Sequence, residues 1–252
     1  MIYYFSGTGN SQHVAKSIAT ALRDQAVSIA DTMKRKQFSH PLEEGESVGI
    51  VCATHFWGLP ALVEEFLKQV NIPYGHYVYF VATYGTTTGQ VGHFAKKVLQ
   101  KRDIPLDATF SVKMPDTWTP IFNLTNTDKV ALQNKKADEE LQQVIARIQR
   151  KEKGNFMRHR IPLLLSFIYH FTYGSQRKTS HFHVEKSCNG CGLCARNCPM
   201  EAIYISDSHP TWTKDRCTMC LQCLHSCPRF AIQYGSHTKK HGQYLHPERQ
   251  RK

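Results

Sequence analysis

The sequence predicts an α/β domain built on a doubly wound parallel sheet, followed by a small, cysteine-rich α+β domain. Two observations lead to this prediction. Short apolar runs alternate with helical patterns over roughly the first 150 residues, which is typical of parallel sheets with crossover helices, and eight of the nine cysteines lie between Cys188 and Cys227. A length of 252 residues, 41% of them hydrophobic and 21% charged, suits two globular units.

The first element is an apolar strand at residues 1–5, followed by a loop of small and hydroxyl residues. Apolar residues then recur at helical spacing from Val14 to Leu22. A loop of this kind at a helix start directs backbone N–H groups and hydroxyls at an anion. It lacks the lysine of a nucleotide-triphosphate loop and the third glycine of a dinucleotide loop. A simple helix cap is the alternative interpretation.

Two further strand–loop–helix units follow the first. Their strands are residues 48–53 and 77–82, their loops 54–60 and 83–89, and their helices 61–70 and 90–100. Ligands bind beyond the carboxyl ends of parallel strands, so the three loops are expected to share one site. A long amphipathic helix at residues 128–150 is expected to close the sheet.

The first loop resembles the phosphate loop of flavodoxins, [Ser/Thr]-x-Thr-Gly-x-[Ser/Thr], through Ser6, Thr8, Gly9 and Ser11. This resemblance implies a strand order of 2-1-3-4-5 and bound FMN. The implied phosphate ligands are Ser6, Gly7, Thr8, Gly9, Asn10 and Ser11. The implied surroundings of the flavin ring are Thr54, Phe56, Trp57, Gly58, Thr83, Tyr84 and Gly85.

Three residues in these loops are given more specific roles. Trp57 and Tyr84 are expected to stack on the ring, with Phe56 as a competitor for the position of Trp57. The peptide at Gly58 is expected to turn toward flavin N5 and tune the flavin potentials, since glycine adopts both conformations readily. By contrast, Cys52 is interpreted as inert core and His55 as a residue that positions its loop rather than moving protons.

The cysteines form an internal repeat. Cys188, Cys191, Cys194 and Cys198 precede Pro199, and Cys217, Cys220, Cys223 and Cys227 recur 29 residues later before Pro228. This spacing resembles bacterial two-cluster ferredoxins, in which the fourth cysteine of each run serves the other cluster. The resemblance implies one [4Fe–4S] cluster on Cys188, Cys191, Cys194 and Cys227, and a second on Cys217, Cys220, Cys223 and Cys198. Zinc would need paired rather than tripled cysteines, and disulfides do not suit a chain without a secretory signal.

The two repeats differ around their cysteines. Gly190, Gly192 and Ala195 allow close backbone approach in the first loop. The second loop carries Met219, Leu221 and Leu224 at the matching places, so its backbone geometry is not predicted.

The predicted domains are residues 1–153, a connector at 154–180, the cluster domain at 181–237, and a basic tail at 238–252. Most of the formal net charge of +12 lies in the connector and tail. Because no nucleic-acid motif accompanies it, we expect a docking or steering role and no nucleic-acid partner. The tail is interpreted as solvated, and a metal role for His241 and His246 is disfavoured.

The apolar run at residues 161–171 is too short to span a bilayer, so no transmembrane segment is expected. The favoured interpretation is a helix between the two domains, and peripheral membrane contact is the alternative. No secretory signal opens the sequence, which predicts a cytoplasmic location. The sequence makes no prediction of oligomeric state.

The whole chain resembles bacterial flavodoxin–ferredoxin fusion proteins, also called ferrodoxins. The resemblance implies an iron–sulfur flavoprotein that passes electrons between two [4Fe–4S] clusters and FMN, and on to a redox protein. The basic charge of the tail adds the expectation of docking onto an acidic or membrane-bound partner. A cluster is expected to approach the flavin within a complex or after domain motion. The alternative is an FMN-dependent oxidoreductase that reduces a small substrate or quinone, with the clusters as its electron supply.

Overall fold

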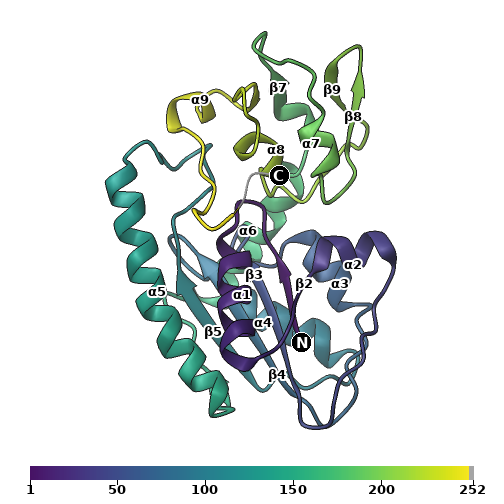
Figure 1. Ribbon diagram of the computed structural model, residues 1–252, viewed down its shortest axis with the longest axis vertical. Helices are drawn as coiled ribbons and strands as arrows, with labels where there is room; N and C mark the ends of the chain where they lie inside the picture. The colour runs from purple at the N-terminus through teal and green to yellow at the C-terminus, as the bar shows by residue number, and fades with distance from the viewer. Residues whose placement is uncertain (250–252) are drawn as a thin grey trace.

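A computed structural model describes residues 1–249, apart from the side chains of residues 166–171. Its main feature is a parallel sheet in the order β2-β1-β3-β4-β5-β6 (Figure 1). The strands are β1 (Ile2–Phe5), β2 (Ala26–Ser28), β3 (Ser47–Ala53), β4 (Tyr77–Tyr84), β5 (Ala108–Lys113) and β6 (Gly154–Asn155). The predicted order of the first five strands is confirmed. The sequence did not predict β6, which pairs with Ala108 and Thr109 at one edge of the sheet.

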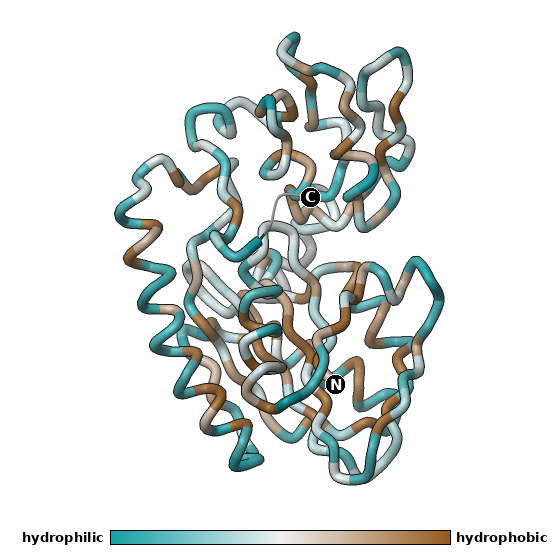
Figure 2. Tube along the Cα trace, viewed as in Figure 1, coloured by the Kyte–Doolittle hydropathy of each residue, from teal (hydrophilic) through white to brown (hydrophobic). Residues whose placement is uncertain are grey.

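Helices cover both faces of this sheet. One apolar core packs against α2 (Ile29–Arg35), α3 (Ala61–Leu67) and α4 (Val91–Gln100). The other packs against α1 (Asn10–Leu22) and α5 (Thr127–Gln149). Figure 2 shows the apolar segments gathered in the middle of this domain. The predicted doubly wound α/β architecture is therefore confirmed.

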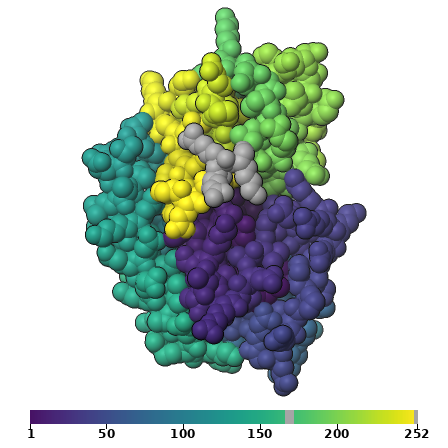
Figure 3. Space-filling view, in the orientation of Figure 1, coloured from purple at the N-terminus to yellow at the C-terminus, as the bar shows by residue number. Residues whose placement is uncertain are grey.

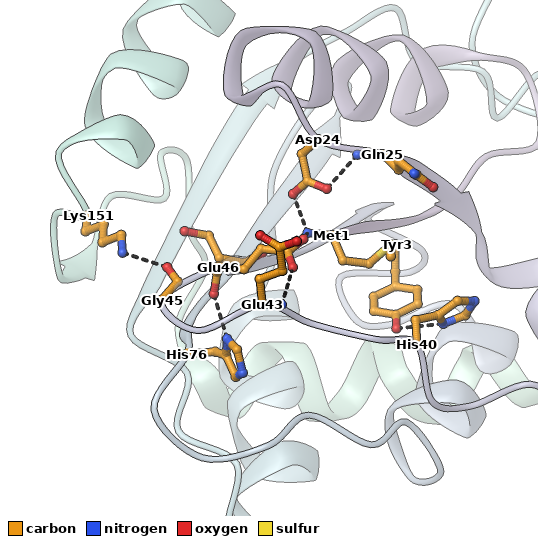
Figure 4. A network of polar contacts seen from close by, with 11 residues as sticks. Met1, Tyr3, Asp24, Gln25, His40, Glu43, Gly45, Glu46, His76 and Lys151 are labelled. Carbon is orange, nitrogen blue, oxygen red and sulfur yellow. Dashed lines mark hydrogen bonds and ion pairs between the residues drawn. The ribbon is translucent and has the colours of Figure 1, made fainter.

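A network of polar contacts joins the amino-terminal ends of neighbouring strands (Figure 4). The amino group of Met1 donates to the carboxylate of Asp24 and to Glu46 Oε1, the latter at 2.7 Å. Nearby, the Tyr3 hydroxyl lies 3.0 Å from His40 Nδ1. These contacts tie β1 to the segments on either side of it, at the end of the sheet opposite the carboxyl-end loops.

The remaining elements form a small domain with two antiparallel pairs, β7 with β10 and β8 with β9. In chain order they are α6 (Leu163–Gln176), a 3₁₀ turn (Thr179–His181), β7 (Phe182–Val184), α7 (Leu193–Arg196), β8 (Ile203–Ser206), β9 (His209–Trp212), α8 (Gln222–His225), β10 (Ile232–Tyr234) and α9 (Thr238–His241). The short helices α7 and α8 start 29 residues apart, as the cysteines do. The sequence duplication is therefore also a structural one.

Helix α6 contacts both domains through Tyr173, which is only 4% exposed. Its hydroxyl accepts from the Ala61 N–H at 3.2 Å and donates to the Thr218 carbonyl at 2.9 Å. At the other end of the helix, Leu164 is 75% exposed. The predicted membrane contact of residues 161–171 falls partly on side chains outside the described residues. Among the described helices, none combines the length and apolarity that a bilayer crossing requires.

The prediction of a solvated tail is wrong for the described part. Thr238, Tyr244 and His246 are buried, and the segment runs back along the first domain (Figure 3). Tyr244 brings a ring that packs and a hydroxyl that donates to Asn10 Oδ1 at 2.8 Å. The segment was predicted to be solvated because its composition is polar. Its aromatic rings and hydrogen bonds instead hold it against the first domain. Arg251 and Lys252, two of the predicted tail cations, lie outside the described residues.

Candidate functional site

The loop between β1 and α1 has the geometry of an anion-binding helix start. Gly9 adopts a φ of 107°, and its N–H donates to Ser6 Oγ at 3.0 Å. Ser11 Oγ lies 2.8 Å from Thr83 Oγ1, which joins this loop to the end of β4. The 13-residue helix α1 begins at Asn10 with its N-terminal N–H groups facing the loop. Residues 6–11 therefore surround the start of α1, and their role as phosphate ligands stays a prediction.

The second loop is a tight hairpin that carries two aromatic residues at its tip. His55 and Gly58 exchange both backbone hydrogen bonds, at 3.0 and 2.8 Å. Phe56 and Trp57 have φ values of 45° and 62°, as in a type I′ turn, which costs strain in residues other than glycine. Gly58 is thus held in a bridge, and the Trp57 carbonyl accepts from the Gln90 N–H at 2.9 Å. A turn of the Trp57–Gly58 peptide toward a flavin would have to break two hydrogen bonds.

The third loop shares its space with Asp116, which the sequence did not single out. A Cβ on Gly85 would lie 2.2 Å from Asp116 Cβ, so only glycine fits there. The Asp116 carboxylate accepts from the Trp118 N–H at 3.1 Å and from the Thr86 hydroxyl at 3.2 Å. Burial raises the pKa of Asp116.

The three loops line one cavity of about 580 Å³. Most of the predicted flavin-site residues reach it, namely Ser6, Gly7, Thr8, Asn10, Ser11, Thr54, Phe56, Trp57, Thr83, Tyr84 and Gly85. Gly9 and Gly58 are not among the described residues that line it. The lining that sequence reasoning missed comes from residues 114–118, 121 and 122 after β5, from Thr172 and Gln176 of α6, and from Met219, Cys220 and Leu221.

The donors around the cavity fit a flavin mononucleotide. Thr54 Oγ1 is buried in the cavity wall and has no hydrogen-bond partner among the described residues. Such an orphan hydroxyl is expected where a ligand supplies the missing bond. The helix start suits the phosphate, and Trp57 and Tyr84 offer aromatic surface for a ring system.

The first cysteine set gathers around one small cavity, lined by Cys188, Cys191, Cys194 and Cys227. This set includes Cys227 from the second repeat, as the sequence predicted. The left-handed φ values of Gly190 and Gly192, 69° and 74°, wrap the loop around the cavity. Burial, and then the nearby thiols of Cys227 and Cys191, raise the pKa of Cys194 to about 11.

The second set, Cys198, Cys217, Cys220 and Cys223, is also brought together. Burial, with a smaller effect of the nearby Cys198 thiol, raises the pKa of Cys217 to about 11 and that of Cys220 to about 12. Thiols crowded in this way resist deprotonation until a metal supplies compensating positive charge. The chemistry of both sets therefore fits the predicted iron–sulfur clusters.

The two halves share the same ligand geometry. Cys198 Sγ accepts from the Ala202 N–H and Cys227 Sγ from the Ala231 N–H, both at 3.3 Å. Met219 and Leu221 adopt φ values of 55° and 52°, the left-handed conformation that glycines adopt in the first repeat. Their side chains, 3% and 2% exposed, are instead buried against the cavity described above.

The second cysteine loop and the phosphate loop are in direct contact. A Cβ on Gly7 would lie 2.3 Å from the Cys220 carbonyl oxygen and 2.9 Å from Cys220 Cβ. The two cysteine sets are neighbours as well, because helix α7, which carries Cys194, contacts helix α8, which carries Cys223. The second cysteine set therefore lies between the first cysteine set and the cavity.

Buried polar contacts hold this arrangement. His55 Nδ1 donates to the Thr218 carbonyl at 3.1 Å, and burial lowers the pKa of this histidine to about 4. His225 Nε2 donates to the Thr117 carbonyl at 2.9 Å. The imidazole of His55 is thus neutral, and it joins the loop after β3 to the second cysteine loop. This agrees with the positioning role predicted for His55. Cys52 is fully buried, and burial raises its pKa, as expected for inert core.

Comparison with known proteins assigns both halves of the chain. The flavodoxin domain model matches residues 1–143, and the 4Fe-4S dicluster domain model matches residues 187–232. An uncharacterised polyferredoxin-like protein of Methanocaldococcus jannaschii is 32% identical over 62 residues, covering 19% of this chain. The chain spans 37% of the length of that relative.

Two solved structures align with part of this chain. A protein of Bacteroides uniformis described as a flavoprotein covers 46% of this chain and 90% of its own, at 18% identity and a TM-score of 0.32. The rubredoxin oxygen:oxidoreductase of Desulfovibrio gigas covers 58% of this chain and 36% of its own, at 15% identity and a TM-score of 0.35. The family matches imply FMN in the first domain and iron–sulfur clusters in the second, and together they indicate electron transfer.

Proposed function

We propose that this chain, which belongs to the flavodoxin domain family, moves electrons between two [4Fe–4S] clusters and an FMN on the same polypeptide, and passes them to a redox protein. One observation carries the proposal. Met219, Cys220 and Leu221 of the second cysteine loop form one wall of the cavity that the three sheet loops line. When bound, the clusters exchange single electrons and the flavin accepts one or two.

In this proposal, the chain's own residues hold the flavin and keep water out. Ser6, Thr8 and Ser11 bind the phosphate together with the N–H groups at the start of α1. Thr54 Oγ1 gains its missing hydrogen bond from the bound flavin. The buried side chains of Met219 and Leu221 flank Cys220 in the cavity wall, so the second cysteine set reaches the cavity directly.

The contact at Gly7 bears on the expectation that a cluster approaches the flavin within a complex or after domain motion. The interface is already closed by the bonds of His55, Tyr173 and His225 described above. Linking the centres at a fixed short distance replaces an encounter between molecules by an internal step. Domain motion is therefore unnecessary for this transfer.

In this proposal, the external redox partner exchanges electrons with the chain at the first cysteine set. Cys191 is exposed, and the cations Lys186, Arg196 and Arg229 are exposed close to this set in the chain. Arg196 donates to the Cys191 carbonyl at 2.9 Å, which fixes one positive charge beside the exposed loop. An acidic surface on the partner would complement this face and speed encounter at low salt. The predicted acidic partner is thus assigned to this face rather than to the tail.

The test is time-resolved absorbance of the anaerobic holoprotein after a pulse of a one-electron reductant. We expect cluster bleaching followed by flavin reduction at a rate independent of protein concentration. A flavin reduction rate that rises in proportion to protein concentration would contradict the internal path. Arg196→Glu should slow reduction by an acidic donor protein without altering the internal rate.

One observation favours a second candidate function, the reduction of a small molecule at the flavin. Asp116 lines the cavity, and its raised pKa suits a proton donor for a reduced substrate. Asp116→Asn separates the two functions, because it would abolish the reduction of a quinone while leaving the internal transfer rate unchanged. Loss of both activities would instead assign Asp116 a role in shaping the site.

A further inference from the structure

The C-terminal segment, residues 244–249, covers the outer side of the phosphate loop (Figures 1 and 3). The His246 N–H donates to the Thr8 carbonyl at 2.9 Å, and Arg249 donates to the Gly7 carbonyl. A Cβ on Gly9 would lie 2.8 Å from His246 Cβ. The segment is therefore packed on the loop rather than loosely laid over it.

This packing brings two histidines and a carboxylate together. His13 of α1 and His246 are 7% and 5% exposed, and their rings stack with centroids 4.1 Å apart. His13 Nδ1 lies 2.6 Å from Glu248 Oε2. One ligand atom from each of the three residues lies within 4.8 Å of the other two. Buried histidine pairs with a carboxylate are a common donor set for zinc, iron and nickel.

A second carboxylate orients the His13 ring. His13 Nε2 lies 2.6 Å from Asp138 Oδ1 of α5. A metal-ligating histidine almost always donates its other N–H to such a partner, which fixes the tautomer and presents the remaining nitrogen to the ion. With Nε2–H bound to Asp138, Nδ1 is the nitrogen that faces Glu248. The Glu248 N–H in turn donates to His246 Nδ1 at 3.3 Å, so the backbone also ties Glu248 to the second histidine.

We propose that His13, His246 and Glu248 bind one divalent transition-metal ion, with Asp138 as the residue that positions His13. The Glu248 side chain is 65% exposed, so the site is open to solvent and water completes the coordination. The ion would join α1, which starts immediately after the phosphate loop, to the segment that covers the loop. The metal site rests on these residues alone and does not depend on the proposed electron-transfer function.

The experiment is equilibrium dialysis of the untagged holoprotein with Ni²⁺ after removal of adventitious metal by EDTA. Nickel is chosen because imidazole suits it, whereas zinc competes more strongly for thiolates. We expect one Ni²⁺ per chain beyond the cluster iron. Glu248→Gln should lose this binding, and Asp138→Asn should weaken it about 10- to 100-fold. His209→Gln, at an exposed position outside the cluster, should bind as the parent does.

Hydrogen exchange of the C-terminal peptide gives an independent readout. In the parent, Ni²⁺ should slow exchange of the peptide that contains the His246 amide, and in Glu248→Gln it should not. Because Glu248 is largely exposed, this variant is expected to fold even if a substitution of buried His246 does not. Failure to bind Ni²⁺ above the level of Glu248→Gln, or equal exchange with and without the ion, would overturn the proposal.

Discussion

The contact between the phosphate loop and the second cysteine loop predicts that Gly7→Ala is disruptive. The added methyl group would meet the Cys220 carbonyl oxygen at 2.3 Å and Cys220 Cβ at 2.9 Å. Both distances are far below van der Waals contact, and the atoms belong to a loop that its cysteines fix in place. Relief therefore requires the two loops to move apart, which lengthens the path between the cavity and the second cluster.

The expected cost is that of overpacking a fixed interior, about 1–3 kcal/mol. For a chain of this size, such a loss lowers Tm by about 2–4 °C per kcal/mol. The assay is anaerobic calorimetry of the holoprotein, together with the internal electron-transfer rate. Both Tm and the internal rate should fall in Gly7→Ala.

A matched control exists in Gly174, within helix α6. A Cβ there meets nothing within 4 Å, so Gly174→Ala adds the same methyl group without a collision. Because alanine is the better helix former, we expect this variant to be more stable by about 0.5–1 kcal/mol, with an unchanged internal rate. If Gly7→Ala matched Gly174→Ala in both Tm and rate, the two loops would not be in contact and the proposed path would be refuted.

Three further predictions follow from single side chains. Thr54→Val should weaken FMN binding about 2- to 10-fold without destabilising the FMN-free protein, because the hydroxyl has a partner only when ligand is bound; a titration of the FMN-free, cluster-loaded protein measures this. Met219→Gly removes the backbone strain of a left-handed residue but also removes a buried side chain. We therefore expect the free energy of unfolding, measured by calorimetry, to fall by about 1–3 kcal/mol. A more stable variant would mean that the backbone strain is the larger effect. The pKa of His55 is about 4 in the folded chain, against 6.5 in the unfolded chain. The contribution of neutral His55 to the free energy of unfolding is therefore fully present above pH 6.5 and is lost as the pH falls toward 4. Between pH 7 and pH 5 the parent should therefore lose about 2 kcal/mol more than His55→Gln, and equal losses in a pH series of Tm values would show that His55 is not neutral in the fold.

The sequence predicted those parts of the fold that have a strong internal pattern. The strand at residues 48–53 and the helix at 128–150 were predicted to within a residue or two of β3 and α5. The edge strands β2 and β6, three and two residues long, carry no such pattern, since pairing with a neighbour defines them. Edge strands of this length are decided by tertiary contacts rather than by their own residues.

The sequence predicted the site residues that belong to a recognisable motif. It missed the residues that reach the cavity only because the two domains pack against each other. Residues 6–11 and the eight cysteines have distinctive spacing, and the structure brings each group together. Residues 114–118 carry no motif, yet they follow β5 at the same sheet edge, so the strand-end rule could have included them. The cavity wall at Met219 and Leu221 depends on how two domains meet, which no local pattern records.

The difference between the two cysteine repeats indicates which side of the cluster domain faces the first domain and which side faces solvent. Both repeats need two left-handed residues, and glycine meets that need without strain in the first. The second uses Met219 and Leu221, each with a backbone cost of about 1–2 kcal/mol. A duplicated loop retains such a cost only if the side chains contribute something that glycine cannot. Here they flank Cys220 in the cavity wall, while Cys191 of the first set remains exposed. The two copies of the duplication thus differ in their surroundings: the first keeps a cysteine exposed to solvent, and the second packs its loop into the interior of this chain.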